Sequence, residues 1–262
     1  MALDRPFRAW VWLTWLALLL GLSALFYSLH LDFGFAREKL PYLLGLRLAP
    51  DGFVQGAVLT LLVTACSMAF AFIIALLTAL GRLSSNPFAF GLATFYASLF
   101  RGTPLLVQVL IIYLALPQVG IVLGALTSGI MALSLNYGAY LAETIRSGIM
   151  GVPAGQREAA LALGLPMWLV GWKITAPQAL RLIIPPAGAQ FISMLKDSSL
   201  VSVMGLWELN FLAQSYARAT YHYMEMLVSA AAIYWAMSIA FELVQFRLER
   251  RFGAGVAPAI RR

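Results

Sequence analysis

The sequence predicts an all-α integral membrane protein with about six transmembrane helices. Hydrophobic residues make up 61% of the 262 residues and charged residues only 11%, whereas soluble domains carry about 25% charged residues. A helix needs about 20 apolar residues to cross the roughly 30 Å of hydrocarbon in a bilayer. Several runs of that length occur along the chain, which is long enough for one membrane domain of several helices.

The first half of the chain holds four such runs, at about 10–29, 53–80, 93–116 and 121–145. The first is expected as a retained span, because no convincing small-residue cleavage site follows it. Segment 32–51 mixes both charges and contains Pro41 and Pro50, which predicts an exterior loop with an interfacial helix near 40–46. Segments 81–87 and 117–120 contain the Gly and Pro typical of turns. Residues 1–51 are therefore interpreted as an N-terminal transmembrane helix and its exterior loop.

The second half holds two runs, at about 187–206 and 226–246. The first is a poor span, because it is interrupted by Lys196-Asp197-Ser198-Ser199, and a discontinuous helix is expected there. The second is followed by several arginines, so that 251–262 is interpreted as a basic cytoplasmic tail. Residues 52–250 are expected to form one transmembrane domain.

The stretch 148–186 separates these halves and is too polar to be a span. It carries four charged side chains among helix-forming residues: Arg157, Glu158, Lys173 and Arg181. Pro153 suits the first turn of a helix, Gly164 suits a left-handed C-cap, and Pro166 can open a second helix. Pro177 is expected to disrupt or redirect the chain. The prediction is a pair of short helices joined at Gly164 and standing clear of the lipid.

Six spans place both termini on one side, and the distribution of Lys and Arg decides which side is cytoplasmic. Most Lys and Arg residues fall on the face that holds both termini and the 148–186 loop. The exceptions are Arg37, Lys39, Arg47 and Arg218. Both termini and the loop are therefore expected in the cytoplasm. The net charge of +7 is explained by this use of Lys and Arg as topology signals. The sequence lacks the basic cluster with interleaved aromatic residues that would indicate nucleic-acid binding.

Polar groups at membrane depth are costly, about 2.5–3.5 kcal/mol for a central Arg or Lys. Arg101 lies in the third run, where Gly102 and Pro104 break the helix and free backbone groups that lipid cannot satisfy. Such a break is tolerated where it faces protein or a water-filled path. Arg101 is therefore either part of a pathway or gate, or an arginine that extends to the cytoplasmic interface. The physics alone favours neither interpretation.

Other polar side chains in the apolar runs also have two interpretations. Glu143 and Arg146 lie three residues apart on one helix and can pair on one face, most simply as a structural ion pair. Asn136 lies deeper, and its amide suits a bond between helices, which is favoured, or a contact with a substrate's ammonium or carboxylate. Lys196 and Asp197 are adjacent on a helix and point in different directions, so they are not expected to neutralise each other.

The 148–186 loop contains a spaced motif: Glu158, Ala159, Ala160, Gly164, Ile174 and Pro177. This motif resembles the EAA loop of ABC-importer permeases. In that family the loop supplies a helix that docks into a groove on a cytoplasmic ATPase. One departure is Ala176, where the family pattern usually has Leu, and only a modest difference in packing is expected from it.

Three further strings occur in the order typical of the same family. They are RGTPLLVQ at 101–108, LNYGAYLAETIRSG at 135–148 and LKDSSLVSVMGLWEL at 195–209. Each resembles a signature of the polar amino-acid branch of these permeases. With the EAA loop they cover most of 52–209, whereas the first span lies outside the resemblance.

The resemblance implies a type I ABC importer permease, with a core of five transmembrane helices and one added N-terminal helix. It implies import of polar amino acids across the cytoplasmic (inner) membrane of a bacterium by alternating access. The implied partners are a cytoplasmic ABC ATPase dimer, a second permease subunit and an extracytoplasmic amino-acid-binding protein. ATP and Mg would be bound by the ATPase. The chain itself is expected to be no enzyme and to bind no metal or cofactor.

Two groups of site residues are expected, the first from the resemblance and the second from the polar residues and helix breaks at membrane depth. Those expected to couple to the ATPase are Arg157, Glu158, Ala159, Ala160 and Gly164. Those expected along the substrate pathway or at a gate are Arg101, Gly102, Thr103, Pro104, Gln108, Asn136, Lys196, Asp197, Ser198 and Ser199. Whether the second group contacts the substrate or only holds the helix breaks is left open.

Two other classes of function fit the sequence less well. An intramembrane enzyme needs a nucleophile and a base, or a metal cluster, but His30 and His222 are far apart and no HExxH or Walker motif occurs. The main alternative is a stand-alone secondary carrier or channel for amino acids or related small solutes. Such carriers commonly contain internal repeats, and none is evident in this chain.

Overall fold

The computed structural model describes residues 5–29, 31–49 and 52–252. Most of the predicted basic tail and His30 lie outside the described residues. In the part described, the regular secondary structure is all helical, without a strand. The helices are α1 (Arg5–Ser28), α2 (Phe33–Leu43), α3 (Gly56–Leu83), α4 (Pro87–Gly102), α5 (Leu105–Leu110), α6 (Ala125–Met150), α7 (Ala154–Ala162), α8 (Met167–Leu169), α9 (Ala176–Asp197), α10 (Leu209–Thr220) and α11 (Tyr223–Phe252). Short π- or 3₁₀-helical segments connect several of them: η1 (Ile111–Ala115), η2 (Leu116–Val119), η3 (Val170–Thr175) and η4 (Ser198–Met204).

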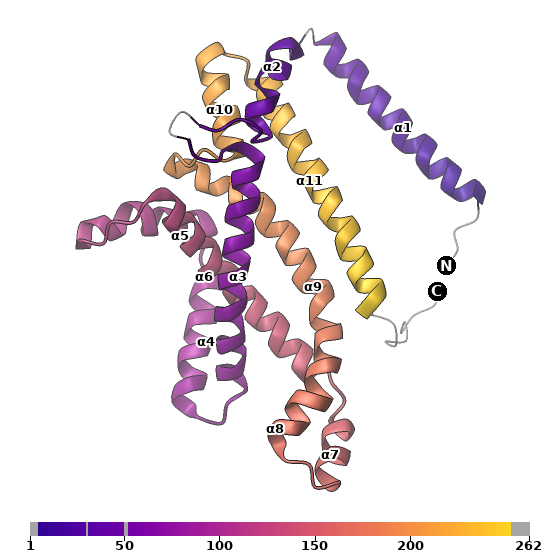
Figure 1. Cartoon of the computed structure of the whole chain (residues 1–262), viewed down its shortest axis with the longest axis vertical. Coiled ribbons are helices and arrows are strands. Elements are labelled where there is room, and N and C mark those ends of the chain that lie inside the picture. Colours follow the sequence, from indigo (N-terminus) through magenta and orange to yellow (C-terminus); the bar gives the residue numbers. More distant parts are fainter. Residues whose placement is uncertain (1–4, 30, 50–51, 253–262) are drawn as a thin grey trace.

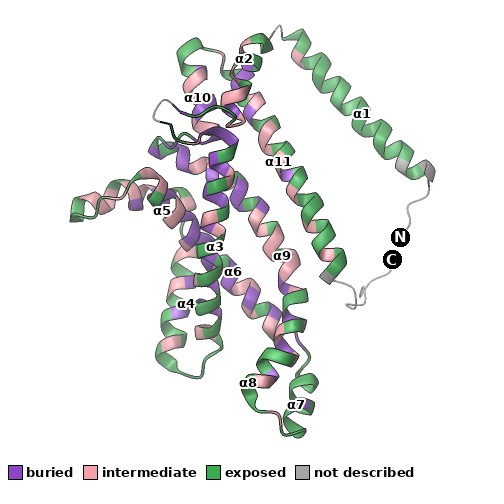
Figure 2. Ribbon diagram, in the orientation of Figure 1, coloured by how far each residue is buried: buried purple, intermediate pink, exposed green. Residues whose placement is uncertain are grey.

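The core lies between α3 and α6, with α4 and α9 packed beside them (Figure 1). Every fourth residue on one face of α3 is small and fully buried: Ser67, Ala71, Ala75 and Ala79. Small side chains let two helix backbones approach closely, which is how membrane helices gain packing energy. The hydroxyl of Ser134 on α6 donates to the carbonyl of Ser67 at 3.2 Å. Figure 2 shows buried residues gathered along α3 and α6, whereas α1 is exposed along its length.

Three described helices have the length and apolarity of a membrane span: Ala9–Ser28, Gly56–Leu83 and Tyr223–Arg251. α4 and the segment from Leu105 to Val119 count as a fourth if the bent pair is one span. The other two expected spans are α6, with 26 residues, and α9, with 22 residues. At 1.5 Å per residue both are long enough to cross about 30 Å of hydrocarbon. They are less apolar than the three spans, and α6 buries Ser128, Ser134 and Asn136 in the protein.

The third expected span is not one continuous helix. α4 ends at Gly102 and α5 begins at Leu105, and the segment Leu105–Val119 is bent by 104° from α4. Pro104 lacks a backbone N–H and restricts the residue before it to extended conformations, and Thr103 has φ −117° and ψ 144°. The break expected at Gly102 and Pro104 is thus confirmed, and it turns the chain sharply.

The loop 148–186 is shorter than expected, because α6 continues to Met150 and α9 begins at Ala176. The expected pair of short helices is present as α7 and α8, and Gly164 between them has the left-handed φ of +78°. The disruption expected at Pro177 takes a milder form. The π-helical segment η3 precedes α9, and Pro177 occupies its first turn, where a missing N–H costs nothing.

Two segments near the other end of the bundle differ from expectation. The interfacial helix near 40–46 is α2, which begins earlier because Asp32 accepts a hydrogen bond from the Gly34 N–H at 2.8 Å. α10 lies between the last two expected spans, where no helix was predicted. Its N-cap is Glu208, whose buried carboxylate accepts from the backbone N–H groups of Asn210 and Phe211 at 2.9 and 2.7 Å.

Candidate functional site

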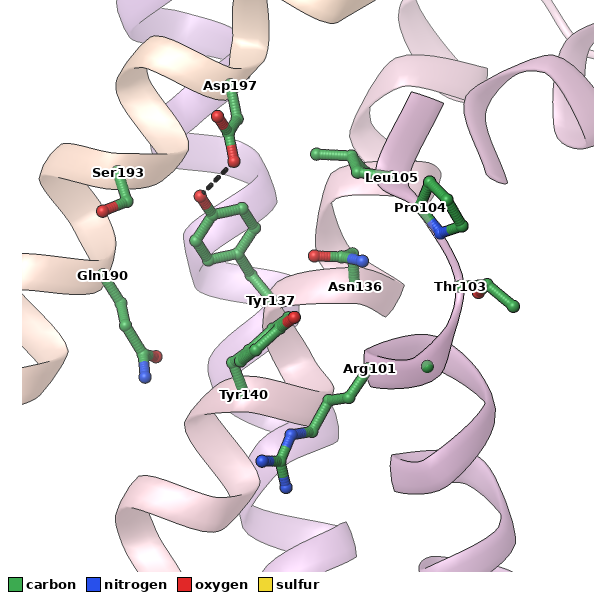
Figure 3. Close-up of a pocket in the computed structure, with 11 residues that line it drawn as sticks. Arg101, Thr103, Pro104, Leu105, Asn136, Tyr137, Tyr140, Gln190, Ser193 and Asp197 are labelled. Carbon is green, nitrogen blue, oxygen red and sulfur yellow. Dashed lines mark hydrogen bonds between the residues drawn. The ribbon is translucent and has the colours of Figure 1, made fainter. Parts of the chain in front are cut away.

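A cavity of about 500 Å³ opens beside the break between α4 and α5 (Figure 3). Residues of four helices (α4, α5, α6 and α9) and of the turn between α4 and α5 surround it. Its lining residues are Arg101, Gly102, Thr103, Pro104, Leu105, Asn136, Tyr137, Tyr140, Gln190, Ser193 and Asp197. A volume of this order is within the roughly 300–1,000 Å³ typical of small-molecule sites. The lining is polar for a site among membrane helices, where polar side chains are usually functional.

Gln108 holds the helix break in place. Its Nε2 donates to the carbonyl oxygens of Phe100 and Thr103 at 2.9 and 3.1 Å, and to the Thr103 hydroxyl at 2.8 Å. These carbonyls lie where α4 ends and would otherwise lack the partners of a continuing helix. Gln108 therefore satisfies the backbone groups that the break frees, and does not itself line the cavity.

Asn136 joins the break to α6. Its Nδ2 donates to the Phe100 carbonyl at 3.1 Å and to the Gln108 Oε1 at 3.2 Å. The favoured interpretation of Asn136 as a bond between helices is thus present in the structure. The same residue also forms part of the cavity wall, so Asn136 both joins the helices and belongs to the candidate site.

Asp197 supplies the negative charge of the cavity. It ends α9, and one of its carboxylate oxygens accepts a hydrogen bond of 2.7 Å from the hydroxyl of Tyr137 on α6. Figure 3 shows the two side chains meeting at one wall of the cavity. A hydroxyl donor fixes the position of the carboxylate and leaves its second oxygen to accept from a ligand.

Arg101 supplies positive charge at the opposite wall. Its guanidinium lies over the ring of Tyr140, 5.5 Å from the ring centroid, and points away from Asp197 in Figure 3. Nη1 of Arg101 is 3.3 Å from the carboxylate of Glu143. Glu143 also pairs with Arg146, as expected from the sequence, and with Arg82 on α3. One carboxylate on α6 thus contacts three arginines from three helices.

The remaining predicted pathway residues do not reach the cavity wall. Lys196 is exposed next to Asp197, and no ion pair joins these two described residues. Ser198 is buried, and its hydroxyl donates to the Leu195 carbonyl at 2.7 Å. The carbonyl of Ser199 accepts from the Asn210 side chain at 3.4 Å. Both serines therefore hold the turn from α9 into η4.

Sequence reasoning missed five of the cavity residues, the apolar Leu105 and four polar ones. Tyr137 and Tyr140 lie three apart on α6, and Gln190 and Ser193 lie three apart on α9. Spacing of three places each pair on one helix face. That spacing, together with neighbouring Asn136 and Asp197, is the signal that could have indicated them.

The residues expected to couple to an ATPase lie far along the bundle, at the end that carries α7 and α8 (Figure 1). Arg157, Glu158 and Ala159 are exposed on α7, whereas Ala160 is buried. α7 packs against η3, and the small side chain of Ala160 is buried within the loop instead of being exposed to a partner. The surface around this turn is also apolar, with Leu163, Met167, Trp168 and Trp172 between 61% and 82% exposed.

A metal site requires several ligating side chains close together. In ranges 5–29, 31–49 and 52–252, no group of three or more His, Cys, Asp or Glu side chains could hold a metal ion. His222 stacks on Phe35 with ring centroids 5.4 Å apart, and its Nδ1 is 3.3 Å from Glu225. His222 therefore belongs to the packing of α2 against α11.

Comparison with known proteins identifies relatives along most of the chain. Residues 71–254 match the family described as "Binding-protein-dependent transport system inner membrane component". The arginine transport system permease protein ArtQ of Bacillus subtilis is 34% identical over 85% of this chain and 98% of its own length. The L-cystine transport system permease protein TcyB of the same organism is 39% identical, over 77% and 87%.

A putative glutamine transport system permease protein, GlnP of Rickettsia conorii, is 36% identical over 76% of this chain and 91% of its own length. Among solved structures, one described as "Crystal structure of an amino acid ABC transporter with histidines" matches with a TM-score of 0.77 and 37% identity, over 84% of this chain and 99% of that chain. An inward-facing MetNI methionine ABC transporter matches with a TM-score of 0.65 and 20% identity, over 75% and 94%. At 20% identity, the match to the MetNI transporter shows a similar fold alone.

Proposed function

Because the chain belongs to the binding-protein-dependent transport system inner membrane component family, we propose that it is the membrane-spanning permease subunit of an ATP-driven importer of amino acids. Relatives named as permeases for arginine, cystine and glutamine support this substrate class. The chain carries out no chemistry in this proposal. It provides a path that opens alternately to the two sides of a bacterial inner membrane.

The observation that carries the proposal is the cavity at the helix break. A free amino acid bears an ammonium and a carboxylate on one carbon, and the cavity carries Asp197 on one wall and Arg101 on the other. Asp197 suits the ammonium, and Arg101 suits the carboxylate through its fork of N–H donors. Asn136 can bond to either group. The discontinuous helix is typical of transporters, which expose backbone groups at a substrate site near mid-membrane.

The turn from α7 to α8 is the proposed contact with a cytoplasmic ATPase. It combines exposed Arg157 and Glu158 with exposed Leu163, Trp168 and Trp172. Large exposed apolar side chains beside charged ones are typical of protein–protein interfaces. Glu158 would anchor the contact, and Gly164 would set the bend that presents the apolar side chains.

The remaining partners follow from the family. A second permease subunit, identical or homologous, would complete the membrane part, and an extracytoplasmic amino-acid-binding protein would deliver the substrate. Two copies of the ATPase would bind ATP and Mg and close on the bound ATP, moving α7 and α8. In this arrangement both termini and the α7–α8 turn lie in the cytoplasm.

Co-purification tests the partnership. The tagged chain is expressed together with its chromosomal neighbours, extracted in mild detergent, and every retained subunit is identified and counted. A nucleotide-binding subunit near one per permease chain supports the proposal, and the permease count distinguishes a homodimer from a heterodimer. A chain that purifies alone and well behaved would contradict it and favour a stand-alone carrier or channel.

A further inference from the structure

A second cavity adjoins the first toward the end of the bundle that carries α7 and α8. It has a volume of about 420 Å³ and is lined by Arg82, Thr94, Ala97, Ser98, Arg101, Gly102 and Tyr140. Arg101, Gly102 and Tyr140 line both cavities. The two are therefore neighbouring compartments on one side of α4, with the Arg101 guanidinium at their boundary.

One face of α4 forms a wall of this second cavity. Thr94, Ser98, Arg101 and Gly102 are spaced at intervals of four, three and one residues, which places them along one side of the helix. Two hydroxyls and a guanidinium thus line a path along α4 from the first cavity towards its N-terminal end. That end and the α7–α8 turn lie at the same end of the molecule (Figure 1).

The charge around the second cavity is positive. Arg82, Arg101 and Arg146 all contact Glu143, and one carboxylate balances only one of these three guanidinium groups. Asp197 lines the first cavity only. Of the residues described, no carboxylate lines the second cavity, and none besides Glu143 joins the cluster. Positive charge near a low-dielectric wall attracts anions.

Two buried polar atoms at this cavity have no partner. The Nε of Arg82 and the hydroxyl of Thr94 are shielded from solvent and bond to no other described atom. A buried donor without an acceptor costs about 1–3 kcal/mol. Both residues line the cavity, and a small rotation of each side chain would bring these atoms to an acceptor placed there. A carboxylate provides two acceptor oxygens and the negative charge that the cluster lacks.

We propose that this second cavity is a carboxylate-binding site, which holds the transported amino acid after it leaves the first cavity. The proposal rests on the amino-acid import proposed above. Arg101 would keep contact with the carboxylate while the ammonium leaves Asp197, because its guanidinium lies between the two compartments. Arg82 and Thr94 would then take over the carboxylate oxygens. The absence of an acidic side chain in the lining would leave the ammonium unpaired and favour onward release.

Charge-selective modification of a single cysteine tests the site directly. Cys66 is the only cysteine in the chain, so Cys66→Ala gives a cysteine-free parent into which Ser98→Cys is introduced. The purified transporter complex without nucleotide is treated with an anionic (sulfonatoethyl) or a cationic (trimethylammonioethyl) methanethiosulfonate. Each rate is divided by the rate at which the same reagent reacts with glutathione. Thr94→Cys serves as a second reporter if Ser98→Cys does not assemble.

The proposal predicts that the anionic reagent is favoured by about tenfold or more at residue 98, because positive charge focused in a cavity raises encounter rates. Acetate and the transported amino acid should slow the reaction, whereas methylammonium should not. Arg82→Gln in the same background should abolish both the preference and the protection by acetate. Ser147→Cys is the matched control, because its cavity contains Glu143 but neither Arg82 nor Arg101. It should show no protection.

Two results would overturn the proposal. One is equal modification by both reagents without protection by acetate. The other is protection of the delipidated complex by phosphatidylglycerol but not by acetate, which would assign the cavity to a lipid headgroup. ATP-dependent uptake by the Cys66→Ala parent is measured separately, so a failure of the import function itself is distinguished from a failure of the second site. With import intact, Thr94→Val should lower the maximal rate severalfold and leave KM unchanged.

Discussion

The hydroxyl of Tyr137 donates a 2.7 Å hydrogen bond to the carboxylate of Asp197 and so joins α6 to the last residue of α9. α6 also carries Asn136, which contacts the helix break, and Tyr140, which lies under Arg101. The bond therefore connects the acidic and basic walls of the cavity through one helix. A change in the position of α9 would move Asp197 relative to Arg101.

Loss of the acidic wall should weaken substrate binding. Asp197→Asn keeps the shape and an acceptor oxygen but removes the charge that is proposed to face the ammonium. Hydrogen bonds to charged groups contribute about 1.5–3 kcal/mol, so KM for uptake should rise about ten- to hundredfold. Tyr137→Phe, which keeps the carboxylate, should have a smaller effect. An unchanged KM in Asp197→Asn would remove Asp197 from the site.

The helix break should depend on Gln108. Gln108→Met keeps a side chain of similar length but leaves the Thr103 carbonyl without its side-chain donor and the Phe100 carbonyl with only that of Asn136. Unsatisfied buried groups cost about 1–3 kcal/mol each, so the complex should lose several degrees of thermal stability in detergent. Gln118→Met is the control, because Gln118 is exposed. Equal melting of the two variants would show that the break is held by other contacts.

Coupling should depend on Glu158 and not on membrane insertion. Glu158→Lys reverses the charge on the exposed face of α7 and should reduce ATP-dependent uptake at least tenfold while the protein remains in the membrane fraction. Like charges brought together at an interface cost several kcal/mol. Glu38→Lys, which reverses an exposed glutamate on α2, should leave uptake unchanged. Normal uptake by Glu158→Lys would exclude it from the interface.

Stability should fall as pH rises, because of Glu208. Burial raises the pKa of Glu208 to about 7, compared with about 4.3 for an unfolded glutamate. Below about pH 4 the carboxyl group is protonated in both the folded and the unfolded protein, and its contribution to stability is complete. Between about pH 4 and pH 7 it ionises in the unfolded protein but stays protonated in the fold, so the free energy of unfolding falls as pH rises. The thermal midpoint should therefore be lower at pH 8 than at pH 5, and this difference should shrink in Glu208→Gln. An equal pH dependence in both proteins would contradict the assignment.

Much of the local structure could be predicted because local rules determine it. Gly102 and Pro104 indicated the helix break, Gly164 the bend between α7 and α8, and the three-residue spacing the pairing of Glu143 with Arg146. In each case the cause lies within a few residues of the chain. The expected fold class and family are confirmed by the all-helical structure and by the match of residues 71–254.

The rest depends on contacts between distant segments. Arg82 and Arg101 reach Glu143 from other helices, at sequence separations of 61 and 42 residues, which no local spacing reveals. Lys196 and Asp197 are adjacent, yet only Asp197 faces the cavity. α10 went unpredicted because its start depends on the buried carboxylate of Glu208, which also accepts from Tyr234 on α11 at 2.7 Å. Such pairs appear only once the helices are packed.

The central claim is tested most directly by uptake of radiolabelled amino acids into proteoliposomes. These contain the purified permease complex, with its binding protein on the outside and ATP or a non-hydrolysable analogue inside. Import that requires ATP hydrolysis, and that unlabelled free amino acids compete, is the predicted result. Uptake of equal size without ATP, or by the permease without any ATPase subunit, would contradict the account and assign the chain to carriers or channels.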